Sequence, residues 1–227
     1  MELQVEQLQR ALQAVSGAVN PRHTSEVLQH VLLRATATGV QVVASDNEIT
    51  AIAIVTPEGA KPVEILLPPK FLEIVKQLTD DTLRITPDDV SLQLTSGGGR
   101  WRLATANPQD YPIWASPADT AGLTLDHVEL SDALQGVAFC CDNQSTRYAL
   151  GAVRLEYDDW ECLMIVATDG RRLASRAVVA GIEHATQIAA LIPSKAVKAI
   201  RSMQAVGKRS EEHTSELQSH LNLVCRL

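Results

Sequence analysis

Two aspartates in similar surroundings are the first candidates for chemistry in this sequence. Asp46 lies in VASDNEITA (residues 43–51) and Asp169 lies in VATDGRRLA (166–174). A carboxylate after a hydrophobic strand could bind a divalent cation, as a phosphoesterase or nuclease would require. Neither stretch contains a histidine, and aspartate is common in turns that follow strands. We therefore interpret both aspartates as turn residues and predict no metal site.

Three other patterns could indicate an enzyme, and each has a simpler explanation. The glycines of TSGGGRW (95–101) lack the Lys-Ser/Thr and the helix of a P-loop, so they predict a hairpin. Ser131 and Ser145 have no histidine at a spacing that suggests a hydrolase. The cysteines form no CxxC pair and are interpreted as small buried hydrophobes: Cys140, Cys141, Cys162 and Cys225. No cofactor is predicted.

Positive charge on one side of a predicted helix is a stronger signal. In PSKAVKAIRSM (193–203), helical periodicity places Lys195, Lys198 and Arg201 on one face and the apolar residues on the opposite face. No acidic residue interrupts this segment. The segment therefore predicts a helix with a cationic face.

A second segment repeats this layout. In PPKFLEIVKQL (68–78), Lys70 and Lys76 share a face that Glu73 interrupts. Either pattern alone usually indicates only a helix face that is exposed to solvent. Its repetition in a chain of net charge −7 favours two equivalent helices that face one polyanion. Lys and Arg bind phosphates of any base sequence, and 4% aromatic residues are too few for base stacking, so duplex DNA backbone is the predicted partner.

The two basic segments belong to an internal repeat. ALQAV begins at residue 11 and ALQGV at 133; VASDNEI begins at 43 and VATDGRR at 166; Lys70 aligns with Lys195. The separations are 122, 123 and 125 residues (133 − 11, 166 − 43 and 195 − 70), and the order is preserved. Three matches in the same order predict a duplicated domain.

Each copy is predicted to be an α+β domain with two helices packed on antiparallel sheets. A short strand comes first, at 3–6 and at 123–130, and a helix follows, with Ser131 as its N-cap in the second copy. Further strands lead through a proline into the basic helix. The predicted later strands are 27–36, 40–46, 48–55, 82–87, 90–96 and 100–106 in the first copy, and 150–157, 162–169 and 172–179 in the second.

The predicted domain limits are residues 1–118 and 119–208, with the Pro- and Ala-containing stretch 107–122 as a linker. The second copy stops before counterparts of the three strands at 82–106. Residues 209–227 differ in composition from the rest. When back-translated, RSEEHTSELQSH resembles one reading frame of a common sequencing-library adapter, so we predict that this tail is not native.

Composition sets the broad class of protein. A hydrophobic content of 45% in 227 residues can build cores and excludes a disordered chain. No apolar run approaches the length of a membrane span, and the acidic, polar N-terminus is not a signal peptide. We expect a cytoplasmic protein with no membrane partner.

Several motifs within this two-copy layout together resemble the bacterial DNA polymerase III beta subunit family, the sliding clamps. They are RYALG (147–151), ATDGRRLA (167–174), DYP (110–112) and the PSK helix start at 193. The resemblance covers residues 1 to about 208. It implies a DNA-clamp fold with three similar domains per subunit, a head-to-tail homodimeric ring around duplex DNA, and no catalysis. It also implies a tether for the DNA polymerase III catalytic subunit, contact with a clamp loader, and docking of other proteins with clamp-binding motifs.

The resemblance assigns residues to two surfaces. Positions that match DNA-facing residues are Arg22, Lys70, Lys76, Gln144, Arg147, Lys195, Lys198 and Arg201. Of these, Gln144 and Arg147 are expected near the end of the second copy's first helix. Positions that match a hydrophobic pocket for partner peptides are Leu150, Thr168, Gly170, Arg171, Arg172 and Leu173. The other half of that pocket belongs to the third domain. Family members often have His where this chain has Arg171, so peptide preference is open.

Three classes of function are compared. A processivity clamp accounts for the repeat, the basic faces and the motifs. A metal-dependent nuclease would require cleavage that Asp169→Ala abolishes. A peptide-binding scaffold without DNA encirclement stays open, because this sequence carries two copies and not three.

Overall fold

The computed structural model describes residues 1–36, 39–55, 62–88, 90–112, 125–142, 147–157, 162–179, 188–202 and 222–225. The chain divides into two compact units. Unit 1 comprises Met1–Trp114 with Ser202–Val224, and unit 2 comprises Ala115–Arg201 with Cys225–Leu227. The predicted boundary near residue 118 lies outside the described residues. Within those residues, no helix has the length and apolarity needed to cross a membrane.

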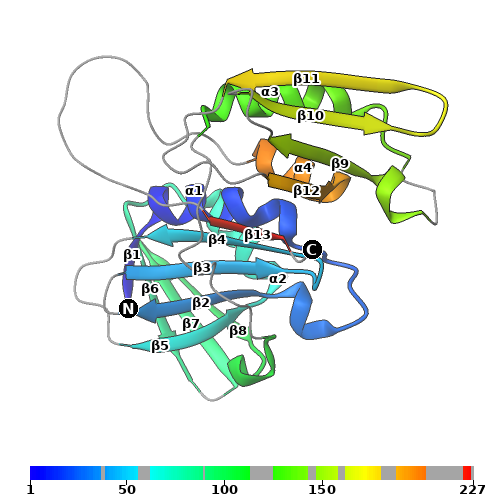
Figure 1. Cartoon of the computed structure of the whole chain (residues 1–227). Helices are drawn as coiled ribbons and strands as arrows, with labels where there is room; N and C mark the ends of the chain where they lie inside the picture. Colours follow the sequence, from blue (N-terminus) through cyan, green and yellow to red (C-terminus); the bar gives the residue numbers. More distant parts are fainter. Residues whose placement is uncertain are drawn as a thin grey trace, which may run out of the picture. The chain divides into compact units, whose positions relative to one another are not determined.

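The described residues of unit 1 form two sheets, two α-helices and short 3-10 helices (Figure 1). The larger sheet has the strand order β13-β4-β3-β2-β5, the smaller has β1-β6-β7-β8, and the pairs within residues 1–112 are antiparallel. Helix α1 packs on β4 and β3 and contacts α2. The elements of this unit up to Ala104 are β1 (Glu2–Gln4), α1 (Val5–Val15), η1 (Ser16–Ala18), η2 (Glu26–Gln29), β2 (Val31–Thr36), β3 (Gly39–Ser45), β4 (Ile49–Val55), β5 (Val63–Leu67), α2 (Pro69–Gln77), β6 (Thr82–Pro87), β7 (Ser91–Ser96) and β8 (Gly99–Ala104).

Both helices of unit 1 bury one stripe of apolar residues. In α1, Leu8, Leu12 and Val15 recur at the four- and three-residue spacing of one helix face, and each is at most 5% exposed. In α2, Phe71 and Val75 lie one turn apart and are both fully buried. Proline at the first position of α2 needs no hydrogen-bond donor there, so the helix begins directly after β5.

The segment after β8 belongs to the core of unit 1. Residues Pro108–Asp110 form a short 3-10 helix, η3, and Tyr111 beside it is 5% exposed. Tyr111 packs with Leu32, Val43 and other buried residues of the larger sheet. The prediction of a linker is therefore wrong for residues 107–111; residues 113–122 lie outside the described part of the chain.

The glycine run forms the predicted hairpin. Ser96 of β7 pairs with Gly99 of β8 across a two-residue turn at Gly97 and Gly98. Gly97 has φ +51°, and a Cβ there would lie 2.5 Å from a carboxylate oxygen of Asp80. Hairpin geometry and side-chain crowding explain these glycines without a bound phosphate.

Unit 2 repeats the larger sheet of unit 1. Its strands follow the order β11-β10-β9-β12, which corresponds to β4-β3-β2-β5, and its pairs are antiparallel. Helix α3 packs on this sheet, as α1 does in unit 1 (Figure 1). The predicted duplication of an α+β fold is thus confirmed. The elements are α3 (His127–Ala138), η4 (Tyr148–Gly151), β9 (Ala152–Tyr157), β10 (Cys162–Thr168), β11 (Leu173–Val179), β12 (Ile188–Pro193) and α4 (Ser194–Ser202).

The start of α3 differs from the prediction. Residues 127–130 are helical, so the strand predicted at 123–130 is wrong for this part, and residues 123–124 lie outside the described chain. The N-cap is Asp126 and not Ser131: one Asp126 carboxylate oxygen accepts hydrogen bonds from Val128 N at 2.9 Å and Glu129 N at 3.0 Å. Asp and Ser both cap helices, and the side-chain geometry at Asp126 decides where this helix begins.

The described residues of unit 2 contain no counterpart of the smaller sheet β1-β6-β7-β8. Equivalent helix positions also differ in burial: Leu8 of α1 is fully buried, whereas Leu130, 122 residues later (130 − 8), is half-buried. In the predicted non-native tail, β13 (Asn222–Cys225) lies beside β4. Residues 209–221, 226 and 227 lie outside the described chain, and the origin of the tail stays a prediction.

Candidate functional site

The predicted cationic face of α2 is exposed as expected. Lys70, Glu73 and Lys76 are exposed, and the opposite face contributes the buried Phe71 and Val75. This face therefore carries two ammonium groups and one carboxylate in contact with solvent.

The cationic face of α4 is narrower than the periodicity predicted. Lys198 is exposed, but Lys195 is half-buried, and Ala199, one turn away on the same side, is fully buried. Arg201 lies on α4, and its side chain is outside the described part of the structure.

The other three residues predicted to face DNA occupy loops. Arg22 is exposed in a turn after α1, where its backbone N–H donates to Asn20 Oδ1 at 3.1 Å. Gln144 lies outside the described residues. Arg147 is exposed at the start of η4, so its expected place near the end of a helix is wrong: α3 ends at Ala138.

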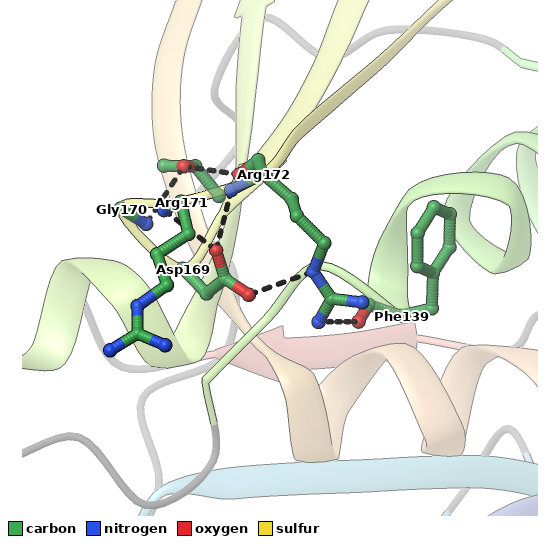
Figure 2. Close-up of polar contacts among 6 residues, drawn as sticks. Phe139, Asp169, Gly170, Arg171 and Arg172 are labelled. Atoms are coloured by element: carbon green, nitrogen blue, oxygen red, sulfur yellow. Dashed lines mark hydrogen bonds and ion pairs between the residues drawn. The ribbon is translucent and has the colours of Figure 1, made fainter.

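Most of the residues predicted to form a peptide pocket lie in one tight turn between β10 and β11 (Figure 2). Asp169 Oδ1 accepts hydrogen bonds from the backbone N–H of Arg171 at 2.9 Å and of Arg172 at 2.7 Å. Gly170 has φ +84°, which favours glycine, and its N–H donates to Thr168 Oγ1 at 3.1 Å. The two backbone N–H donors from Arg172 and Arg171 lower the pKa of Asp169 to about 2, so this carboxylate is ionised at neutral pH.

The same carboxylate also binds the side chain of Arg172. Asp169 Oδ2 accepts from Arg172 Nε at 2.9 Å, while Arg172 Nη2 donates to the carbonyl oxygen of Phe139 at 3.5 Å. The guanidinium carbon lies 5.9 Å from the centre of the Phe139 ring, within the range of a cation–π contact. Figure 2 shows the Arg171 side chain extending away from this cluster.

Two exposed apolar residues lie next to Arg172, one in sequence and one in space. Leu173, the first residue of β11, is 67% exposed, and Phe139, at the C-terminal end of α3, is 63% exposed. Leu150 is half-buried in η4. Phe139 was not predicted from the sequence, since 33 residues separate it from Arg172 (172 − 139) and no motif links them.

The equivalent turn of unit 1 shows which of these contacts the fold itself requires. Asp46 Oδ1 accepts from Glu48 N at 3.1 Å and from Ile49 N at 3.0 Å, and Asn47 has φ 71°. Each residue lies 123 positions before its counterpart, as Asp46 does before Asp169 (169 − 46). The interpretation of both aspartates as turn residues is confirmed. In the described residues, no group of three or more His, Cys, Asp or Glu is arranged to hold a metal ion.

Two units with the same helices and antiparallel strands, each presenting a basic helix, define a duplicated DNA-clamp fold. Residues 1–115 match the model of the DNA polymerase III beta subunit, N-terminal domain, and residues 124–214 match that of its central domain. The chain belongs to the DNA polymerase III beta subunit family. The second match extends six residues (209–214) into the tail predicted to be non-native.

Individual relatives agree with this assignment. The beta sliding clamp of Pseudomonas putida is 31% identical over 198 residues, which cover 86% of this chain and 54% of the relative. That of Vibrio cholerae is 30% identical, covering 83% and 52%. The structure of the DNA polymerase III subunit beta from Pseudomonas aeruginosa has a TM-score of 0.78 at 28% identity, covering 88% and 56%. The chain spans about half the length of the curated relatives it matches.

Proposed function

We propose that this chain is the N-terminal and central part of a processivity clamp, which encircles duplex DNA and tethers the replicative DNA polymerase without catalysing a reaction. The observation that carries the proposal is the match of two consecutive clamp domains to two units that each carry a helix with basic residues, of which Lys70, Lys76 and Lys198 are exposed. A ring needs weak contacts that slide, and lysine contacts to phosphates of any sequence meet that need.

The proposed DNA contacts come from both units. They are Arg22, Lys70, Lys76, Gln144, Arg147, Lys195, Lys198 and Arg201. The whole protein would add a third similar domain and close head to tail with a second copy. Its partners would be the DNA polymerase III catalytic subunit, the clamp loader and other proteins with clamp-binding motifs, in the cytoplasm.

The turn between β10 and β11 supports a second part of the proposal, a pocket for partner peptides. Leu150, Thr168, Gly170, Arg171, Arg172 and Leu173 would form its half on unit 2. The Pseudomonas aeruginosa clamp is known bound to griselimycin, which therefore serves as a probe for this chain. Exposed Leu173 beside an arginine that is bonded to Asp169 suits a ligand with apolar side chains and acceptor oxygens.

The test replaces the basic residues of α4 together, Lys195→Glu, Lys198→Glu and Arg201→Glu. Fluorescence anisotropy at low salt measures binding of the chain to a short duplex, and labelled griselimycin measures the pocket. We expect duplex affinity to fall while griselimycin affinity is unchanged. Equal duplex binding by the substituted and unsubstituted chains would show that α4 does not face DNA.

The same two measurements decide between the clamp and the scaffold. A chain that binds griselimycin but shows no salt-dependent duplex binding would act as a peptide-binding scaffold. The observation that favours this alternative is the exposure of the apolar residues Leu173 and Phe139, which could contact a peptide whether or not the chain binds DNA.

A further inference from the structure

We propose that Asp169 is a positioning residue of the peptide pocket: its carboxylate holds the Arg172 guanidinium beside Phe139, ready to bind acceptor oxygens of a docked peptide. The inference rests on the peptide pocket proposed above. It adds Asp169 and Phe139 to that site and gives each a separate role.

The guanidinium is held from two sides (Figure 2). On one side, Asp169 Oδ2 accepts from Nε at 2.9 Å, a charge-assisted hydrogen bond of ordinary length. On the other side, Nη2 makes a longer contact of 3.5 Å to the Phe139 carbonyl, and the Phe139 ring lies 5.9 Å away. The bond to Asp169 is the shorter of the two, so it sets the orientation of the side chain.

Most donors of Arg172 remain available for a ligand. A guanidinium has five N–H groups, and two of them, one on Nε and one on Nη2, are used by Asp169 and Phe139. The other three have no bonded partner among the described residues, and the side chain is 61% exposed. Leu173 follows directly and is exposed, so an acceptor and an apolar group of one peptide can be bound together.

The fold alone does not require the bond between Asp169 and Arg172. In the equivalent turn of unit 1, Asp46 makes the same two backbone hydrogen bonds, and the residue in the place of Arg172 is Ile49, which is fully buried. The turn therefore forms without an arginine at this position. The bond from Oδ2 to an arginine is an addition specific to unit 2.

Asp169→Asn separates the two roles of this carboxylate. The amide keeps an oxygen for the backbone N–H groups of Arg171 and Arg172, but its NH₂ group cannot accept from Arg172 Nε. Asp46→Asn is the matched control, because it makes the same change in a turn without the arginine. Arg172 would then have to be ordered on binding, so we expect labelled griselimycin to bind the Asp169→Asn chain about 2- to 12-fold more weakly.

A double-substitution cycle shows whether Asp169 acts through Arg172. We expect the Asp169→Asn, Arg172→Ala chain to bind griselimycin like the Arg172→Ala chain, and Asp46→Asn to leave affinity unchanged. An unchanged affinity of Asp169→Asn, or an equal loss in the Arg172→Ala background, would overturn the proposal.

A second measurement is independent of the ligand. In the ¹⁵N-labelled chain, the Nε–H group of Arg172 is expected to be ordered, to become mobile in Asp169→Asn, and to stay ordered in Asp46→Asn. A mobile group in the unsubstituted chain refutes the positioning role. Absence of griselimycin binding by the unsubstituted chain would show that the half of the pocket on unit 2 does not bind this ligand by itself, while an ordered Nε–H group that Asp169→Asn releases would still support the positioning of Arg172.

Discussion

The basic faces of α2 and α4 differ in charge at one position, and the difference allows a charge exchange at constant net charge. Glu73 of α2 is equivalent to Lys198 of α4, at the same separation of 125 residues (198 − 73) as Lys70 and Lys195, and both are exposed. We predict that Glu73→Lys strengthens duplex binding, that Lys198→Glu weakens it, and that the double exchange restores it. The double variant keeps the net charge of −7.

The expected size follows from the release of counterions. Each lysine–phosphate contact contributes about 0.9 to the slope of log K against log salt concentration. A fourfold rise in salt, from about 50 to about 200 mM, then weakens binding about 3.5-fold per contact. Glu73→Lys should steepen the slope by about 0.9, and Lys198→Glu should flatten it by about the same amount. Repulsion between a new glutamate and a phosphate about 8 Å away adds about 0.5 kcal/mol in water, roughly a further twofold.

The assay is duplex anisotropy across a salt series, with Glu64→Lys as the control. Glu64 lies on β5, outside the two helix faces, and pairs with Arg34 on the neighbouring strand; its replacement changes net charge as much as Glu73→Lys does. If Glu64→Lys and Glu73→Lys steepen the slope equally, total charge and not the helix face governs binding. That result would refute the assignment of α2 to DNA.

Three further predictions concern the scaffold. Burial raises the pKa of Tyr111 to about 12, so the stability that its neutral hydroxyl gives to unit 1 is present below about pH 10 and is lost as pH rises through 12. Tyr111→Phe should remove this pH dependence. It should also lower the free energy of unfolding measured in urea by about 1 kcal/mol, because the N–H of Ser45 loses its acceptor. Gln9 Nε2 donates to two carbonyls at the end of α2, at 2.7 and 3.1 Å. Gln9→Ala should lower the free energy of unfolding of unit 1 by about 1 kcal/mol and lower its melting temperature. Leu134→Ala should lower the free energy of unfolding of unit 2 by about 2–5 kcal/mol. The buried Cys140 should then react faster with a thiol-labelling reagent, while the melting temperature of unit 1 is unchanged.

The sequence predicted the elements that have a clear period or a repeat. Alternating apolar residues located β3, β4, β10 and β11 to within a few residues, and the order of motifs predicted the duplication. The start of α3 was missed because the four residues HVEL fit both a strand and a helix, and a side-chain hydrogen bond at Asp126 decides between them. Tyr111 was missed as a core residue because the prolines around it suggested a linker, while its hydroxyl accepts from Ser45, 66 residues away.

The candidate site was predictable only where it is local in sequence. Thr168 to Leu173 form one turn, so a motif finds them together. The partial burial of Lys195 depends on how α4 packs, and the approach of Phe139 to Arg172 depends on how α3 lies on the sheet. Neither is encoded in a short motif, because tertiary packing brings these groups together.

The duplication itself provides a way to separate fold from function in this family member. Where both copies keep a feature, as with the aspartate whose Oδ1 accepts two backbone N–H groups, the turn requires it. Where equivalent residues differ, as the buried Ile49 and the exposed Arg172 do, the turn forms with either residue, so the turn does not require the arginine. By this reasoning an Arg172→Ile chain should fold with unit 2 at least as stable as before, while griselimycin binding falls. A loss of stability equal to that of a core substitution would show that Arg172 serves the fold, and the assignment of this turn to a peptide pocket would then lose its basis.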